Sequence, residues 1–141
     1  MLRTVLDTNV IVSGTIGNSG SPFIILEAWR KGRFILITSQ TLIDEVERVF
    51  RYPRIQKKYH ITEKQVTNVI KNLINYSIAT PRNIKLSVIT KDPPDNEVLI
   101  AALEGEADYI VTGDADLLEL KSYKGIKIVL PSEFVELLGE N

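Results

Sequence analysis

The amino-acid sequence predicts a single α/β domain over residues 1–141, an α/β/α sandwich with a mainly parallel central sheet. Short apolar runs, typical of buried strands, alternate with longer segments in which apolar residues have helical spacing. Strands that alternate with helices favour a parallel sheet. A length of 141 residues with 44% hydrophobic residues suits one core, and no repeat, low-complexity segment or linker divides the chain.

Four apolar runs have the length of buried strands, and they occupy residues 4–6, 34–38, 109–112 and 127–130. The stretch 78–90 is ambiguous, because Pro81 comes early while an extended pattern of apolar residues follows it. We expect irregular structure or an edge strand there.

Five helices are expected between and after these strands. The first begins at Ser21, which can cap it, has Pro22 in its first turn and ends at Gly32. Thr62 and Gln65 can form a capping box at the start of the third. The remaining helices are expected at residues 39–50, 96–104 and 131–138, and the third ends at about residue 76.

Composition limits the functions that the chain can have. The formal net charge is −1, so attraction of nucleic acid requires a local basic patch or a bound cation. The absence of Cys excludes disulfides, a thiolate zinc site and a cysteine nucleophile. No segment has the apolar length of a signal peptide or a membrane span, so we expect a cytoplasmic protein that does not associate with membranes.

Two aspartates follow predicted strands directly. Asp7 comes after residues 4–6, and Asp114 comes after residues 109–112 with only Gly113 between. Open α/β sheets place their ligand crevices at the carboxyl ends of strands, so both acids should lie at one edge. Taken singly, each also suits a local role, Asp7 in an Asx-turn and Asp114 as the cap of a short helix through Leu118.

Two more acids lie on expected helices. Glu45 falls at the rim of the apolar face of the helix 39–50, from which it can reach a cleft beside the sheet. Its alternative is an ordinary ion pair with Arg48. Asp95 comes just before the apolar run 98–103, at a helix N-terminus where a carboxylate is favoured either as a cap or as a metal ligand.

These four acids indicate a metal site if they lie close together in the fold. Clustered carboxylates repel one another unless a divalent cation neutralises them. Mg²⁺ prefers hard oxygen ligands and keeps several waters, which leaves positions for a phosphate oxygen and an attacking water. The set suits one ion or two, and the sole histidine, His60, lies in a charged stretch away from every acid.

A basic segment follows Glu45. It contains two interleaved tyrosines, Tyr52 and Tyr59, which can stack on unpaired bases while the cations bind phosphates. A solvated helix face or a dimer contact is the alternative for each residue. The candidate RNA-binding residues are Arg48, Arg51, Arg54, Lys57 and Lys58.

Four motifs together resemble the PIN-domain family, specifically the group assigned as toxin components of toxin-antitoxin systems. The motifs are VLDTNV at 5–10, SQTLIDEV at 39–46, DPPD at 92–95 and VTGDADLL at 111–118. Each is weak alone, but the family's order and approximate spacing are kept over nearly the whole chain.

The resemblance implies a parallel sheet flanked by helices and a ribonuclease that uses Mg²⁺ or Mn²⁺. It also implies an RNA substrate, a cognate antitoxin protein as partner and a homodimer. By the same resemblance, Asn9 and Thr112 would brace the site. The metal-binding acids would be Asp7, Glu45, Asp95 and Asp114, with Asp116 as a further acid nearby.

Other functions fit less well. A phosphatase of the haloacid-dehalogenase kind needs a second aspartate two residues after the first, where this chain has Asn9. A phospho-receiver module has no place for Glu45 on a helix. A noncatalytic domain that binds RNA or protein stays open, as does an RNA-processing nuclease outside any toxin-antitoxin system.

Overall fold

A six-stranded sheet forms the centre of the computed structural model, which describes residues 1–86 and 93–139. The strand order is β3-β2-β1-β4-β6-β5, and every pairing is parallel except that of β5 with β6. The strands are β1 (Arg3–Leu6), β2 (Ile35–Ser39), β3 (Ile78–Thr80), β4 (Tyr109–Val111), β5 (Ser122–Tyr123) and β6 (Ile126–Val129). The structure confirms the predicted α/β fold with a mainly parallel sheet.

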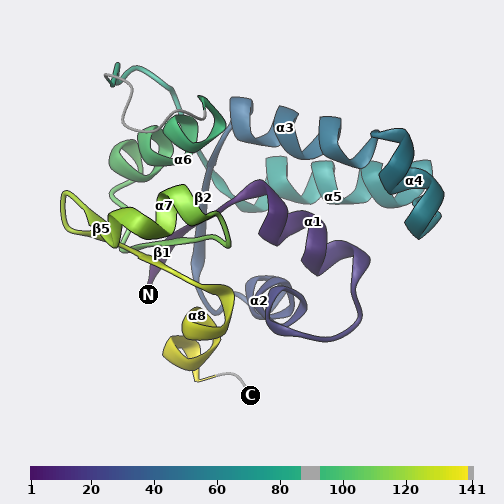
Figure 1. Cartoon of the computed structure of the whole chain (residues 1–141), viewed down its shortest axis with the longest axis horizontal. Helices are drawn as coiled ribbons and strands as arrows, with labels where there is room; N and C mark the ends of the chain where they lie inside the picture. Colours follow the sequence, from purple (N-terminus) through teal and green to yellow (C-terminus); the bar gives the residue numbers. More distant parts are fainter. Residues whose placement is uncertain (87–92, 140–141) are drawn as a thin grey trace.

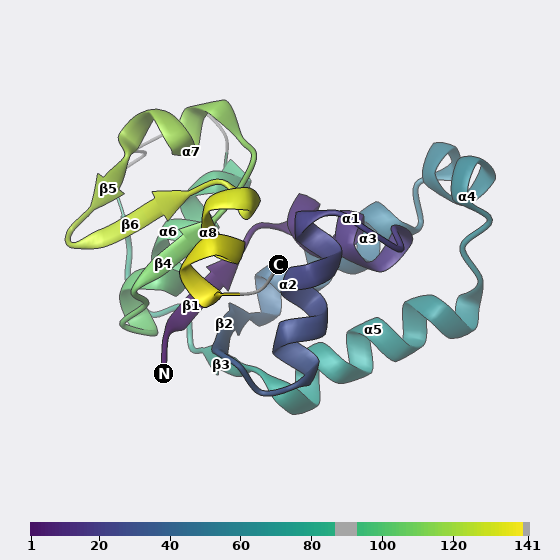
Figure 2. The same ribbon diagram turned by 90° about the horizontal axis from the view of Figure 1, so that it is seen from below.

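Helices cover both faces of the sheet, which gives three layers (Figures 1 and 2). Leu6 and Val111 face a core built with α1, α2, α3, α5 and α8, whereas Val5 and Ile110 face a core built with α6 and α7. The helices are α1 (Thr8–Ile16), α2 (Ser21–Arg30), α3 (Gln40–Phe50), α4 (Pro53–Tyr59), α5 (Glu63–Tyr76), α6 (Pro93–Glu104), α7 (Ala115–Leu120) and α8 (Pro131–Leu138).

The helices with clear local signals begin where the sequence indicates. Ser39 caps α3 by accepting the backbone N–H of Leu42, and Thr62 with Gln65 forms the expected capping box of α5. Ser21 itself is the first residue of α2, so its predicted role as cap is wrong and Gly20 occupies that position.

Helices α1 and α4 were not expected from the sequence. Helix α1 is buried on several sides, including Val10, Ile11, Val12 and Gly14, so it has no clear polar face. Helix α4 has the opposite character, because none of its residues is buried. Short strand β5 was also unexpected. In the ambiguous stretch 78–90, residues 78–80 form the edge strand β3, while 87–90 lie outside the described residues.

The order of the strands reverses beside β1. The chain moves from β1 outward to β2 and β3, and it then returns to place β4 on the other side of β1. Such a reversal is the topological switch point at which open α/β sheets bind ligands, outside the carboxyl ends of the strands. Leu6 pairs with Val111, so Asp7 and Thr112 leave the sheet side by side at this point.

Within the described residues, the structure contains no helix of the length and apolar character needed to span a lipid bilayer.

Candidate metal centre

Thr112 joins the two strand ends that carry acids. Its hydroxyl donates a hydrogen bond to Asp7 Oδ2 at 2.7 Å and accepts the backbone N–H of Asp114 at 2.9 Å. Thr112 is fully buried, so packing holds its side chain in one rotamer with the hydroxyl between Asp7 and Asp114. The family resemblance implied a bracing role for Thr112, and that role stays a prediction.

Asp7 is held by both of its oxygens. Oδ1 accepts the backbone N–H of Thr8 at 2.7 Å, which makes Asp7 the N-cap of α1, and Oδ2 accepts the Thr112 hydroxyl. Asp7 as a whole residue is 8% exposed. A carboxylate at a helix N-terminus is stabilised by the helix dipole, and the remaining lone pairs of its oxygens can still ligate a cation.

Three carboxylates converge beside this pair of strand ends. Asp95, Asp114 and Asp116 each offer an oxygen, and these atoms lie within 4.8 Å of one another. Asp114 caps α7 through Oδ1, which accepts the backbone N–H groups of Asp116 and Leu117, so its capping role and a ligand role are compatible. Asp116, expected as a further nearby acid, lies inside the cluster.

Asp95 is the most buried of the three, with 3% exposure. Helix α6 begins at Pro93, earlier than expected, so Asp95 lies in the first turn and is not the residue before the helix. Pro93 and Pro94 suit this turn because proline has no backbone N–H, and the N–H groups of a first turn have no partner within the helix. A buried carboxylate next to two others is unfavourable unless positive charge compensates it, and hard oxygen donors in close array suit a divalent cation.

Glu45 lies on α3 and pairs with Arg48. This is the alternative that the sequence left open, and Glu45 is outside the group of three converging carboxylates. Its side chain is 23% exposed, against 57% for Arg48, so Arg48 is the more solvent-exposed member of the pair. Its role as a metal ligand stays a prediction.

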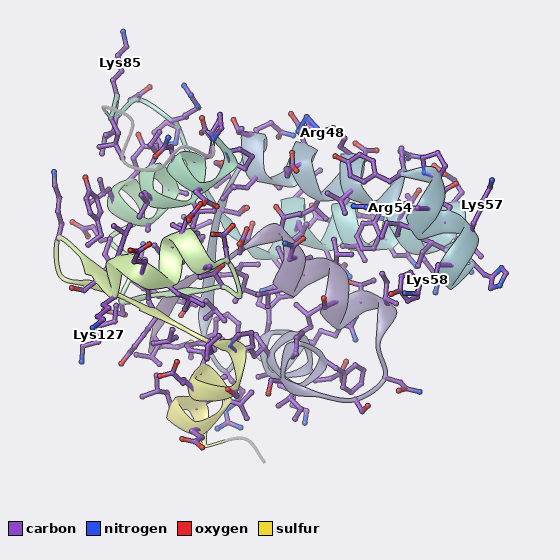
Figure 3. The ribbon with its side chains drawn as sticks, in the orientation of Figure 1. Arg48, Arg54, Lys57, Lys58, Lys85 and Lys127 are labelled. Carbon is purple, nitrogen blue, oxygen red and sulfur yellow. The ribbon has the colours of Figure 1, made fainter. Side chains whose placement is uncertain are left out.

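The other predicted residues occupy the surface. Asn9 is exposed in the first turn of α1 and makes no hydrogen bond through its side chain to another described residue. Arg51 pairs with Glu47 and Glu63, whereas Arg54, Lys57 and Lys58 lie on α4. Figure 3 shows these three cations at the end of the molecule formed by α4.

An α/β sandwich with converging carboxylates at the switch point of its sheet has the arrangement of a protein that binds a divalent cation. The model of the PIN-domain family matches residues 3–116, which include all four predicted ligands. The chain therefore belongs to the PIN-domain family, whose members are nucleases that generally use divalent metal ions.

A relative from Methanocaldococcus jannaschii, described only as an uncharacterized protein, is similar along almost its full length. It is 27% identical over 143 residues, which cover 96% of this chain and 90% of the relative. The similarity extends beyond the residues matched by the family model and reaches the region of β6 and α8.

Proposed function

We propose that this PIN domain is a Mg²⁺- or Mn²⁺-dependent ribonuclease that hydrolyses RNA phosphodiester bonds at Asp7, Glu45, Asp95 and Asp114, with Asp116 as a fifth acid. The observation that carries the proposal is the convergence of three carboxylates within 4.8 Å at the switch point of the sheet. Their oxygens are the hard donors that these ions prefer.

When bound, the divalent ion would supply Lewis acidity to the phosphate and lower the pKa of a coordinated water. The residues of the chain supply the geometry. Thr112 hydrogen-bonds both Asp7 and Asp114, and the first turn of α6 brings Asp95 within 4.8 Å of Asp114 and Asp116. Rigid placement matters because a misplacement of about 1 Å can reduce the rate of an enzyme about a hundredfold.

Cleavage of single-stranded RNA tests the proposal. We expect cleavage with Mg²⁺ or Mn²⁺ and none after chelation with EDTA. Asp7→Asn, Asp95→Asn and Asp114→Asn should each reduce the rate by more than about a hundredfold, the upper end of losses caused by altering the outer shell of a metal site. Asp44→Asn is the matched control, because Asp44 is exposed on α3 and its side chain hydrogen-bonds only Gln40 among the described residues. Full activity in EDTA, or in Asp7→Asn, would contradict the proposal.

We also propose a toxin role, with a cognate antitoxin as partner, a homodimeric state and a cytoplasmic location. The family resemblance supports this role. Expression of the parent protein should arrest growth, co-expression of an adjacent small gene should relieve the arrest, and Asp114→Asn should not cause it. Growth arrest by Asp114→Asn equal to that of the parent would contradict a role through cleavage. Light scattering at micromolar concentration tests the dimer.

A further inference from the structure

The basic segment that follows Glu45 divides into two parts in the structure. Arg48 and Arg51 are neutralised by acids, Arg48 by Glu45 and Arg51 by Glu47 and Glu63. Arg54, Lys57 and Lys58, by contrast, all lie on α4 and form no ion pair with any described residue. Three cations that form no ion pair with a described residue therefore lie on one seven-residue helix.

Helix α4 projects from the rest of the molecule. It contains seven residues, Pro53–Tyr59, of which none is buried, and it lies beyond the ends of α3 and α5 (Figures 1 and 2). A helix of this length gains little stability by itself, and its exposed cations do not pack against the core. Packing against the core therefore does not explain why this helix carries three cations.

Arg51 holds the base of this projection in place. One of its nitrogens contacts Glu63 Oε2 at 2.9 Å and another contacts Glu63 Oε1 at 2.9 Å and Glu47 Oε2 at 3.1 Å. These contacts join the end of α3 to the start of α5, on either side of α4. Hydrogen bonds from Arg51 also lower the pKa of Glu63. Arg51 thus positions α4, and α4 itself presents the available charge.

We propose that α4 is an RNA-binding arm, separate from the acidic centre, that binds the phosphates of a single-stranded substrate. We name it the basic arm and define it by Arg54, Lys57 and Lys58. Charge complementarity supports a polyanion as its ligand. Tyr52, the residue before α4, and Tyr59, its last residue, are 36% and 40% exposed, and accessible rings that can stack on unpaired bases favour RNA over an acidic protein. Lys58 Nζ lies over the Tyr59 ring at 5.3 Å from its centroid, so a base would stack on the opposite face.

The position of the arm predicts a dependence on substrate length, an inference that rests on the proposed function. The carboxyl edge of the sheet lies at the start of α3, and the arm lies beyond its end. The 11 residues of α3 cover about 16 Å at the ordinary helical rise. A very short RNA at the acids cannot reach the arm, whereas a longer one can bind both.

The test compares two variants that lose the same charge. The arm variant combines Arg54→Ala, Lys57→Ala and Lys58→Ala, and Ala preserves helix propensity. The control variant combines Lys31→Ala, Lys85→Ala and Lys127→Ala, three exposed lysines outside the arm, two of which Figure 3 labels far from α4. Circular dichroism verifies that both variants are folded. Each is measured with RNA of about 3 and about 20 nucleotides, below and above the roughly 4–16 nucleotides that single-strand binders cover.

We expect the arm variant to raise KM for the long RNA about tenfold while kcat and cleavage of the short RNA stay unchanged. The slope of log affinity against log salt for the long RNA should fall by about 2, since each lost phosphate contact removes roughly 0.7. The control variant should match the parent in every measurement. Equal effects on both RNAs, or equal effects of the two variants, would overturn the proposal.

Binding measurements separate this inference from the proposed function. Long RNA is titrated into Asp114→Asn protein with and without the three arm substitutions, so that no cleavage is needed. If the parent cleaves no RNA but the arm substitutions weaken this binding, the nuclease proposal fails, whereas the proposal that the basic arm binds RNA stands. Poly-glutamate serves as a competitor, and displacement of RNA at equal charge concentration would show a general polyanion site and overturn the assignment to RNA.

Discussion

Arg48 links the predicted metal site to the charged surface. It pairs with Glu45, the predicted ligand that lies outside the three converging carboxylates. If Glu45 ligates an ion, Arg48 and the ion share the negative charge of one carboxylate. The ion pair then competes with metal binding. Its free energy should therefore lower the metal affinity of the parent protein.

Arg48→Ala should therefore bind Mn²⁺ more tightly than the parent protein. Exposed ion pairs contribute about 0.2–1 kcal/mol, which corresponds to an increase in affinity of roughly 1.5- to 5-fold. Calorimetric titration of the RNA-free protein measures it directly. Arg54→Ala is the control, since it removes the same charge without touching Glu45, and equal affinities in the two variants would argue against competition at Glu45.

At the scale of elements, α6 anchors the chain that follows β3. Near its C-terminus, the carboxylate of Glu104 accepts the backbone N–H groups of Arg82, Asn83 and Ile84 at 2.6–3.0 Å. The Arg82 side chain also binds Glu97 on the same helix. Burial acts to raise the pKa of Glu104, but these hydrogen bonds together lower it below its ordinary value. The helix that carries Asp95 is thus connected to the sheet edge at its other end.

The pKa of Glu104 predicts a pH-dependent stability. Because the pKa is lowered in the folded state, the stabilisation is complete above the ordinary value of 4.5 and is lost as the pH falls through the folded value. Glu104→Gln should lose about 1 kcal/mol of unfolding free energy at neutral pH and melt roughly 3 °C below the parent. The difference between the two melting temperatures should shrink at about pH 3.

Thermal melts at both pH values measure this difference. The control is Glu119→Gln, because Glu119 is exposed on α7 and forms no ion pair with the described residues. A difference between parent and Glu104→Gln that stays constant with pH would show that the charge of Glu104 does not contribute.

At the scale of the whole molecule, the acidic centre opposes folding in the absence of a cation. Asp95, Asp114 and Asp116 are brought together from α6 and α7, so their repulsion is present in the folded chain and mostly absent in the unfolded one. Binding of an ion to the folded state alone reverses this effect.

Metal should therefore change the order of stability between the parent and Asp114→Asn. Without metal, the variant should melt higher, because one like charge is removed while Asn still caps α7 well. Mn²⁺ at about a hundred times its dissociation constant should stabilise the parent by roughly 2.7 kcal/mol and the variant by less. Thermal melts of both proteins with EDTA and with Mn²⁺ decide the matter. Equal shifts would mean that Asp114 is only a helix cap.

The sequence by itself determined what depends on local interactions. The capping box of Thr62 and Gln65, the cap at Ser39 and the apolar runs of β1 and β4 rest on neighbours within a few residues. The parallel sheet followed from their alternation with helices. The placement of Asp7 and Asp114 at one edge followed from the carboxyl ends of those strands.

Only the tertiary structure decided which groups meet. Helix α1 escaped prediction because burial on several sides removes the amphipathic pattern, and α4 because it has no buried face. The order of the strands placed β4 beside β1, and this long-range pairing allows Thr112 to join Asp7 to Asp114. The structure also shows that Arg51 is paired, whereas the cations of the basic arm form no ion pair with a described residue; ion pairing depends on distances that sequence spacing does not specify.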